Sequence, residues 1–158
     1  MRTQLIVLAL MALLGNVAHA ACSMAQIAGD YALMINWSDA GQDGFISGKL
    51  EVNTGGRAVL RGAQLTYKEG SSLVNREGSA TGRIGVAPLC IGELDLSFVH
   101  RASNSEVAEI STTLVVGGDR LSPSIQGAAA IDIKDPAPNN VYTKRNLLGR
   151  LSLQKTSF

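Results

Sequence analysis

The stretch CIGELDLSFVH, residues 90–100, decides the fold class. Leu94, Leu96 and Phe98 fall on one face of this segment, whereas acidic and hydroxyl residues fall on the other. A period of two residues is typical of a β-strand that buries one face and exposes the other. The sequence therefore predicts a strand over 90–100, with these three apolar side chains facing a core.

The same alternation recurs along the chain, in short segments that are separated by Gly, Asn, Asp, Ser and Pro. This pattern is typical of an all-β protein. The predicted strands cover residues 29–37, 45–53, 57–67, 79–86, 90–100, 107–116, 121–133 and 145–155. The third segment changes parity between Leu60 and Leu65, so we predict a β-bulge at Gly62.

Short and long connections alternate between these segments. The tight turns cover 54–56, 87–89 and 117–120, and the longer loops cover 38–44, 68–75, 101–106 and 134–140. In an up-and-down meander, alternate connections lie at the same end, so the long loops would surround one end of the molecule. The prediction is an eight-stranded antiparallel up-and-down barrel, with a two-sheet β-sandwich as the alternative.

The first twenty residues have the pattern of a secretory signal peptide. Arg2 precedes an uncharged apolar run, and Ala18-His19-Ala20 is a small-x-small cleavage site. We predict cleavage before Ala21, a bacterial secreted or periplasmic location, and a single β-barrel domain over 21–158. The mature chain would have 13 basic and 13 acidic residues, because Arg2 is one of 14 basic residues. This neutrality argues against nucleic acid as a partner.

Two cysteines remain in the mature chain, Cys22 and Cys90. An oxidising compartment favours a disulfide between them, and neither a CxxC motif nor a His/Cys cluster indicates a metal site. Both cysteines lie at the tight-turn end of the predicted barrel. We therefore expect residues 22–28 to close this end, held by the disulfide.

The opposite, long-loop end holds the candidate ligand-binding residues. By parity, Trp37, His100 and Arg145 all point into this opening, while Tyr31 and Phe98 line the interior. A Trp, a His and an Arg together suit an acidic or aromatic group above an apolar cavity. The alternative is that they cap an ordinary core. Interior positions of small barrels are usually filled by side chains, although small residues here (Gly48, Gly127, Ala129 and Gly149) leave room for a modest cavity.

The segment IAGDYALMINW, residues 27–37, resembles the first strand of lipocalin-like (calycin-type) barrels, whose mark is Gly-x-Trp. Gly29 and Tyr31 would hold these positions, and Arg145 or Arg150 would match the family's arginine near the last strand. The chain is also similar to uncharacterised bacterial secreted proteins that carry the motifs G-x-Y, G-x-L and C-x-G-x-L. Here these are Gly29-Asp30-Tyr31, Gly48-Lys49-Leu50 and Cys90-Ile91-Gly92-Glu93-Leu94. The resemblance implies a secreted barrel and no particular activity.

The sequence favours a non-enzymatic binding barrel for a small apolar ligand at the open end. His100 is the only histidine of the mature chain, and neither a nucleophile elbow nor an inward carboxylate pair is present. We expect no cofactor, no metal and no integral membrane insertion, since the outward positions are polar. Two alternatives remain: a module that binds an extracellular protein, such as an enzyme inhibitor, through the loops 38–44 and 134–140, and a structural component of the envelope.

Overall fold

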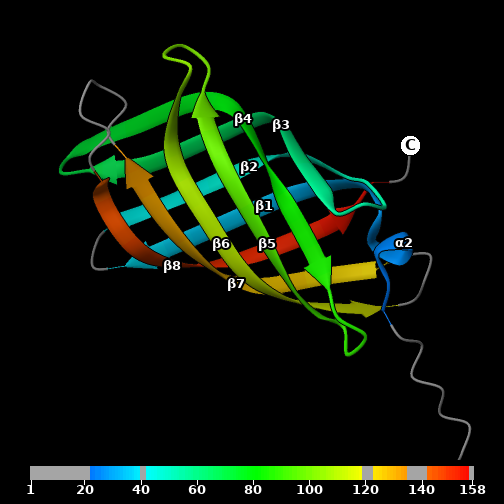
Figure 1. The fold of residues 1–158 in the computed structure, drawn as a ribbon. Coiled ribbons are helices and arrows are strands. Elements are labelled where there is room, and N and C mark those ends of the chain that lie inside the picture. Colours follow the sequence, from blue (N-terminus) through cyan, green and yellow to red (C-terminus); the bar gives the residue numbers. More distant parts are fainter. Residues whose placement is uncertain (1–21, 40–41, 119–122, 135–141, 157–158) are drawn as a thin grey trace, which may run out of the picture.

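Apolar–polar alternation along the chain produces eight antiparallel strands, each paired with its neighbours in sequence, and β8 closes the barrel on β1. A computed structural model describes residues 22–39, 42–118, 123–134 and 142–156. The strands are β1 (Gly29–Asp39), β2 (Gln42–Val52), β3 (Arg57–Glu69), β4 (Ser72–Val86), β5 (Ile91–His100), β6 (Ser105–Gly118), β7 (Pro123–Lys134) and β8 (Tyr142–Lys155) (Figure 1). The predicted barrel is confirmed, and the β-sandwich alternative is wrong. The signal-peptide prediction lies outside the described residues.

The barrel interior is packed with side chains along its length. On β5, Leu94, Leu96 and Phe98 are buried as the alternation predicts, and they join one continuous core. The inward glycines, where the sequence left room for a modest cavity, have close neighbours in the barrel wall. A Cβ atom added at Gly127 would lie 2.3 Å from a backbone oxygen, and one at Gly149 would lie 2.9 Å from another. These glycines instead allow neighbouring strands to approach closely.

The predicted bulge on β3 is confirmed. The pairing of β3 with β4 shifts register between Leu60 and Ala63. Gly62 lies in this interval with a φ of +56°, a left-handed conformation that glycine adopts without steric cost. The bulge explains why Leu60 and Leu65, which differ in parity, are both fully buried.

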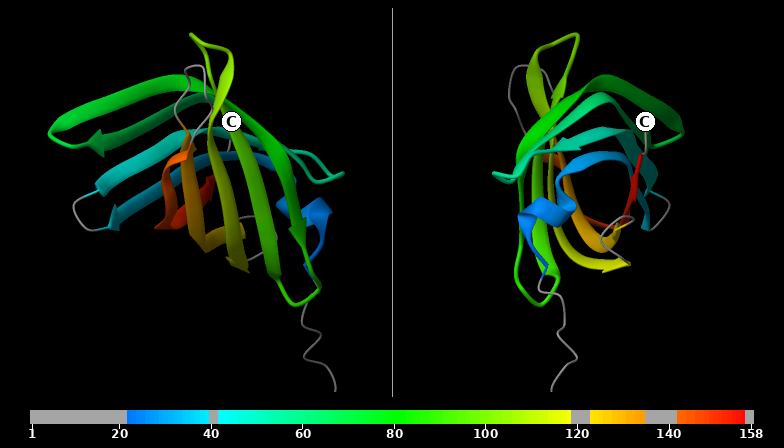
Figure 2. Two further views of the ribbon diagram at one scale, coloured as in Figure 1. Left: turned by 60° about the vertical axis from the view of Figure 1, so that its left-hand side comes forward. Right: turned by 90° about the vertical axis from the view of Figure 1, so that its right-hand side faces the viewer.

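One end of the barrel is closed by the N-terminal segment. Cys22 and Cys90 form a disulfide with a Cα–Cα distance of 5.0 Å, as predicted. The short helix α2 (Met24–Ile27) follows, and Ile27 is fully buried in the core. The hydroxyl of Tyr31 donates a 2.7 Å hydrogen bond to the carbonyl of Ile27, and burial raises the pKa of this phenol to about 12. Figure 2 shows α2 lying at this end of the barrel, which we call the floor.

The opposite end differs from the prediction, because strands replace most of two of the four expected long loops. β1 runs to Asp39 and β2 starts at Gln42, so most of 38–44 is paired strand. β3 and β4 pair as far as Glu69 and Ser72, which converts the predicted loop 68–75 into a hairpin. Continued cross-strand pairing satisfies backbone groups that a loop would leave to water.

The β3–β4 hairpin projects beyond the rest of the barrel (Figures 1 and 2). The described pairing of β4 with β5 begins only at Gly78, and the backbone N–H of Arg101 donates to the carbonyl of Glu77, so the segment 72–76 pairs with β3 alone within the described residues. The β5–β6 turn, Arg101–Asn104, is shorter than predicted. Of the loop predicted over 134–140, Lys134 belongs to β7 and the remainder lies outside the described residues.

Candidate functional site

Trp37 lies inside the open end of the barrel, as its parity predicts. It pairs with Gly44 on β2 and with Gly149 on β8, and only 5% of its surface is exposed. The indole covers Gly44 so closely that a Cβ atom there would lie 2.2 Å from Trp37 Cζ2. Its Nε1 is buried and has no hydrogen-bond partner among the described residues. Buried indole N–H groups normally have a partner, so this donor is unusual.

Tyr67 and Arg76 lie at the same end of the barrel, on β3 and β4, and Gly44 on β2 separates Tyr67 from Trp37. Tyr67 on β3 is the other register partner of Gly44, and it is buried. Arg76 on β4 pairs with Leu65 and is half-buried; its Nη2 donates a 3.0 Å hydrogen bond to Tyr67 Oη. The guanidinium carbon lies 5.9 Å from the centroid of the Tyr67 ring. Arg76 Nε is buried without a described hydrogen-bond partner.

Lys144 brings a second cation to the same aromatic ring. Its ammonium nitrogen lies 5.3 Å from the Tyr67 centroid and donates to the backbone oxygen of Lys68. Lys144 pairs with Ile133 on β7, a fully buried residue, so it occupies an inward position of β8. Arg76 on β4 and Lys144 on β8 therefore both place a cation near the ring of Tyr67. We call Trp37, Tyr67, Arg76 and Lys144 the mouth cluster.

Arg145 does not point into the opening, which corrects the orientation predicted from parity. The pairing of β7 with β8 shifts register between Ile131 and Ile133, and Asn146 in the shifted part of β8 has a φ of +54°. The backbone N–H of Asn146 donates to the Asp132 carboxylate at 2.7 Å, which stabilises this irregular turn of the chain. The shift inverts parity, so Lys144 takes the inward position. Arg145 is exposed, with its guanidinium carbon 4.2 Å from the centroid of the Tyr142 ring.

The other sequence candidates lie elsewhere. His100 ends β5 half-buried, and its Nδ1 lies 3.0 Å from Ser103 Oγ, which places the imidazole beside the β5–β6 turn. Phe98 is a fully buried core residue next to Gly78. Tyr31 directs its hydroxyl to the floor rather than to the opening. Of the five candidates, only Trp37 belongs to the mouth cluster.

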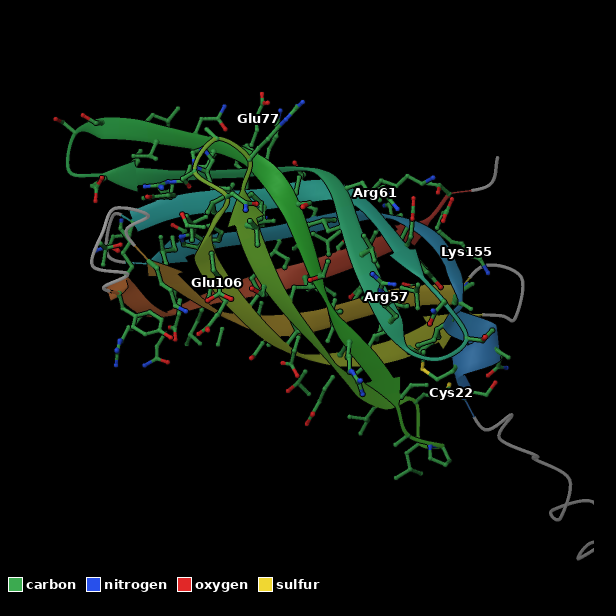
Figure 3. The ribbon with its side chains drawn as sticks, turned by 45° about the horizontal axis from the view of Figure 1, so that its top comes forward. Cys22, Arg57, Arg61, Glu77, Glu106 and Lys155 are labelled. Carbon is green, nitrogen blue, oxygen red and sulfur yellow. A yellow bond between two sulfur atoms is a disulfide. The ribbon has the colours of Figure 1, made fainter. Side chains whose placement is uncertain are left out.

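A second polar group, the outer cluster, joins four strands on the outside of the barrel near the open end. Lys134, which is almost fully buried, donates to Glu106 and, at 2.8 Å, to Glu109. Ser97 donates to the other oxygen of Glu106, and Tyr142 donates to Glu109 at 2.7 Å. Figure 3 shows Glu106 far along the barrel from Cys22. Because every charge here has an opposite partner, we interpret the outer cluster as structural.

The outer cluster predicts a specific pH dependence of stability. Hydrogen bonds from Lys134 and then Tyr142 lower the pKa of Glu109 below its ordinary value of 4.5. Glu109 therefore stabilises the fold above pH 4.5, and this contribution is lost as the pH falls through the lowered folded-state pKa. In urea unfolding at pH 7, Glu109→Gln should be less stable than the parent by at most about 1 kcal/mol, because Glu109 is half-exposed.

The difference between the two proteins should shrink as the pH falls from 4.5 and vanish at the acid limit. The matched control is Glu93→Gln, a change at an exposed carboxylate on the outer face of β5. A difference for Glu109→Gln that stays constant down to pH 2 would contradict the assigned ion pair.

Neither a membrane-spanning helix nor a metal cluster is found in the described parts of the chain. No helix there is long and apolar enough to cross a membrane. No group of three or more His, Cys, Asp or Glu residues there is arranged to hold a metal ion. The disulfide is compatible with an extracellular or periplasmic protein.

The eight-stranded antiparallel barrel is consistent with a lipocalin-like fold. Comparisons with models of known protein families, with curated proteins and with solved structures found no match for this chain. The likeness to lipocalin-type barrels therefore rests on the architecture alone.

Proposed function

We propose that the protein is a non-enzymatic binding barrel, secreted or periplasmic, that holds a small ligand at the mouth cluster. One observation carries this proposal: Trp37 presents a buried N–H donor without a described partner, in a layer of aromatic and cationic side chains at the open end. An unsatisfied buried donor costs about 1–3 kcal/mol, and a ligand that accepts its hydrogen bond would recover this free energy.

The packed interior favours a ligand held at the mouth over the purely apolar ligand that the sequence suggested. Buried side chains fill the barrel from Ile27 at the floor to Trp37 near the opening. These side chains oppose the entry of a long apolar chain. The ligand that we propose therefore lies at the mouth, against the rings of Trp37 and Tyr67, rather than deep inside as a purely apolar ligand would.

Calorimetric titration with small aromatic and aliphatic compounds tests the proposal, together with the fluorescence of Trp37, the only tryptophan. At least one compound should bind saturably and change this fluorescence. Trp37→Phe keeps an aromatic ring but removes the N–H donor, and it should weaken binding about tenfold. The control is Met34→Leu, at an exposed position on the outer face of the same strand, which should bind like the parent.

The result that would overturn the proposal is an absence of heat and of fluorescence change across the panel, combined with native mass spectra of protein from its own host that show no small-molecule adduct. A co-purifying protein in those spectra would favour the alternative of a protein-binding module. Equal loss of binding in Trp37→Phe and Met34→Leu would move the site away from the mouth cluster.

A further inference from the structure

The cations of the mouth cluster differ from several others in the described part of the chain. Lys49, Arg61, Lys68 and Lys134 each lie within 4.0 Å of a carboxylate. Arg76 and Lys144 instead have uncharged described partners, which are the Tyr67 hydroxyl and a backbone oxygen. Two cations that share one ring, with no carboxylate partner among the described side chains, repel each other and attract an anion.

Two residues of the mouth cluster also have buried donors without described partners. Arg76 Nε and Trp37 Nε1 are both buried without a described hydrogen-bond partner. Both residues face inward, and both flank Tyr67: Trp37 across Gly44, and Arg76 through its bond to the tyrosine hydroxyl. An anionic oxygen accepts hydrogen bonds and carries negative charge. A ligand with such oxygens would therefore give the buried donors an acceptor and the two cations a counter-charge.

Three described carboxylates near the open end, those of Asp43, Glu69 and Glu77, do not supply this anion. Asp43 is held by hydrogen bonds from Ser38 and Lys68, which lower its pKa. Glu69 is exposed near the turn of the β3–β4 hairpin, and Glu77 is exposed on the outer face of β4. Figure 3 shows Glu77 pointing away from the barrel.

We propose that the mouth cluster binds the anionic group, a carboxylate or a phosphate, of a small organic ligand. Arg76 and Lys144 supply the charge, Trp37 Nε1 supplies a neutral hydrogen bond, and Tyr67 forms the aromatic wall. This inference rests on the proposed function, because it names the class of ligand for the same site. A guanidinium recognises the oxygens of carboxylate and phosphate groups through its planar set of donors.

Matched probes separate the charge of the ligand from its shape. Calorimetric titration at low salt compares benzoate with neutral benzamide, which has the same ring and nearly the same size. Benzoate should bind at least tenfold more tightly, and raising the salt concentration should weaken benzoate alone. Titration with phenyl phosphate and with inorganic phosphate then distinguishes a carboxylate ligand from an organic or a free phosphate.

Four variants locate the charges. Arg76→Met and Lys144→Met should each weaken benzoate binding about tenfold or more and leave benzamide binding nearly unchanged. The controls each remove a cation that faces out: Arg83→Met, toward the floor end of the same strand as Arg76, and Arg145→Met, next to Lys144. Both controls should bind benzoate within about twofold of the parent, because they change the net charge without changing the site.

The outcomes are distinguishable. If benzoate and benzamide bind equally, the anion inference fails while the proposed function stands. If none of these probes binds, the anion inference fails, and the compound panel with the native mass spectra decides the proposed function. Equal losses in Arg145→Met and Lys144→Met would also overturn the inference, because they would show a general effect of net charge. Circular dichroism checks the fold of each variant; should Arg76→Met unfold, Lys144→Met and the ratio of benzoate to benzamide affinity decide.

Discussion

Removing the disulfide by the double change Cys22→Ala/Cys90→Ala should lower the free energy of unfolding by about 4 kcal/mol. The bond joins residues 68 positions apart, so it removes a large amount of conformational entropy from the unfolded chain. It also fixes α2 against the floor, where Ile27 is fully buried. Urea unfolding of the parent and the variant, followed by circular dichroism, measures the difference.

Two controls separate the crosslink from the cysteine side chains. The parent protein under reducing conditions should lose nearly the same stability, because it keeps both side chains and lacks only the bond. Tyr31→Phe, which removes one buried hydrogen bond to Ile27, should lose only about 1 kcal/mol. A loss below about 1 kcal/mol for the double variant, or a disulfide between two chains in mass spectra, would contradict the structural role of this bond.

The sequence was sufficient to predict the barrel, because one rule, the alternation of buried and exposed side chains along each strand, governs most of the fold. Strand pairing with one buried face imposes a period of two, and this period places Leu94 and Phe98 in the core without knowledge of their neighbours. The disulfide that holds the floor could be predicted as well, because only two cysteines follow the predicted signal peptide and they allow one pairing. Even the bulge at Gly62 left a signal, as parity changes where the glycine stands.

The mouth cluster could be predicted only in part from the sequence, because its membership depends on where the inward–outward alternation breaks and where the strands end. A register shift next to Asn146 places Lys144 rather than Arg145 on the inner face, and adjacent basic residues give no hint of which one faces in. Arg76 follows a segment predicted as loop, although Val74, Arg76, Gly78 and Ala80 share one parity. Strand continuation through 72–78 was the signal that would have found it.

The second large effect is expected at Gly82 on β4, an inward position between the buried residues Ala80 and Ile84. Gly82→Ala should lower the free energy of unfolding by about 3 kcal/mol. A Cβ atom at this position would lie 1.7 Å from the backbone oxygen of Asp95 and 3.0 Å from the Cα of Leu96. Both contacts are with backbone atoms of β5, so no side-chain rotation relieves them, and β4 must move away from β5.

Gly85→Ala is the matched control, because it adds the same methyl group to the same strand. Gly85 is exposed, and a Cβ atom there would have no neighbour within 4 Å. Its stability should stay within about 0.5 kcal/mol of the parent, since surface changes away from special backbone positions have small effects. Equal stabilities for Gly82→Ala and Gly85→Ala would show that β4 and β5 are not in close contact. If Gly82→Ala also weakens ligand binding at the mouth, the close approach of these strands positions Arg76 as well as closing the barrel.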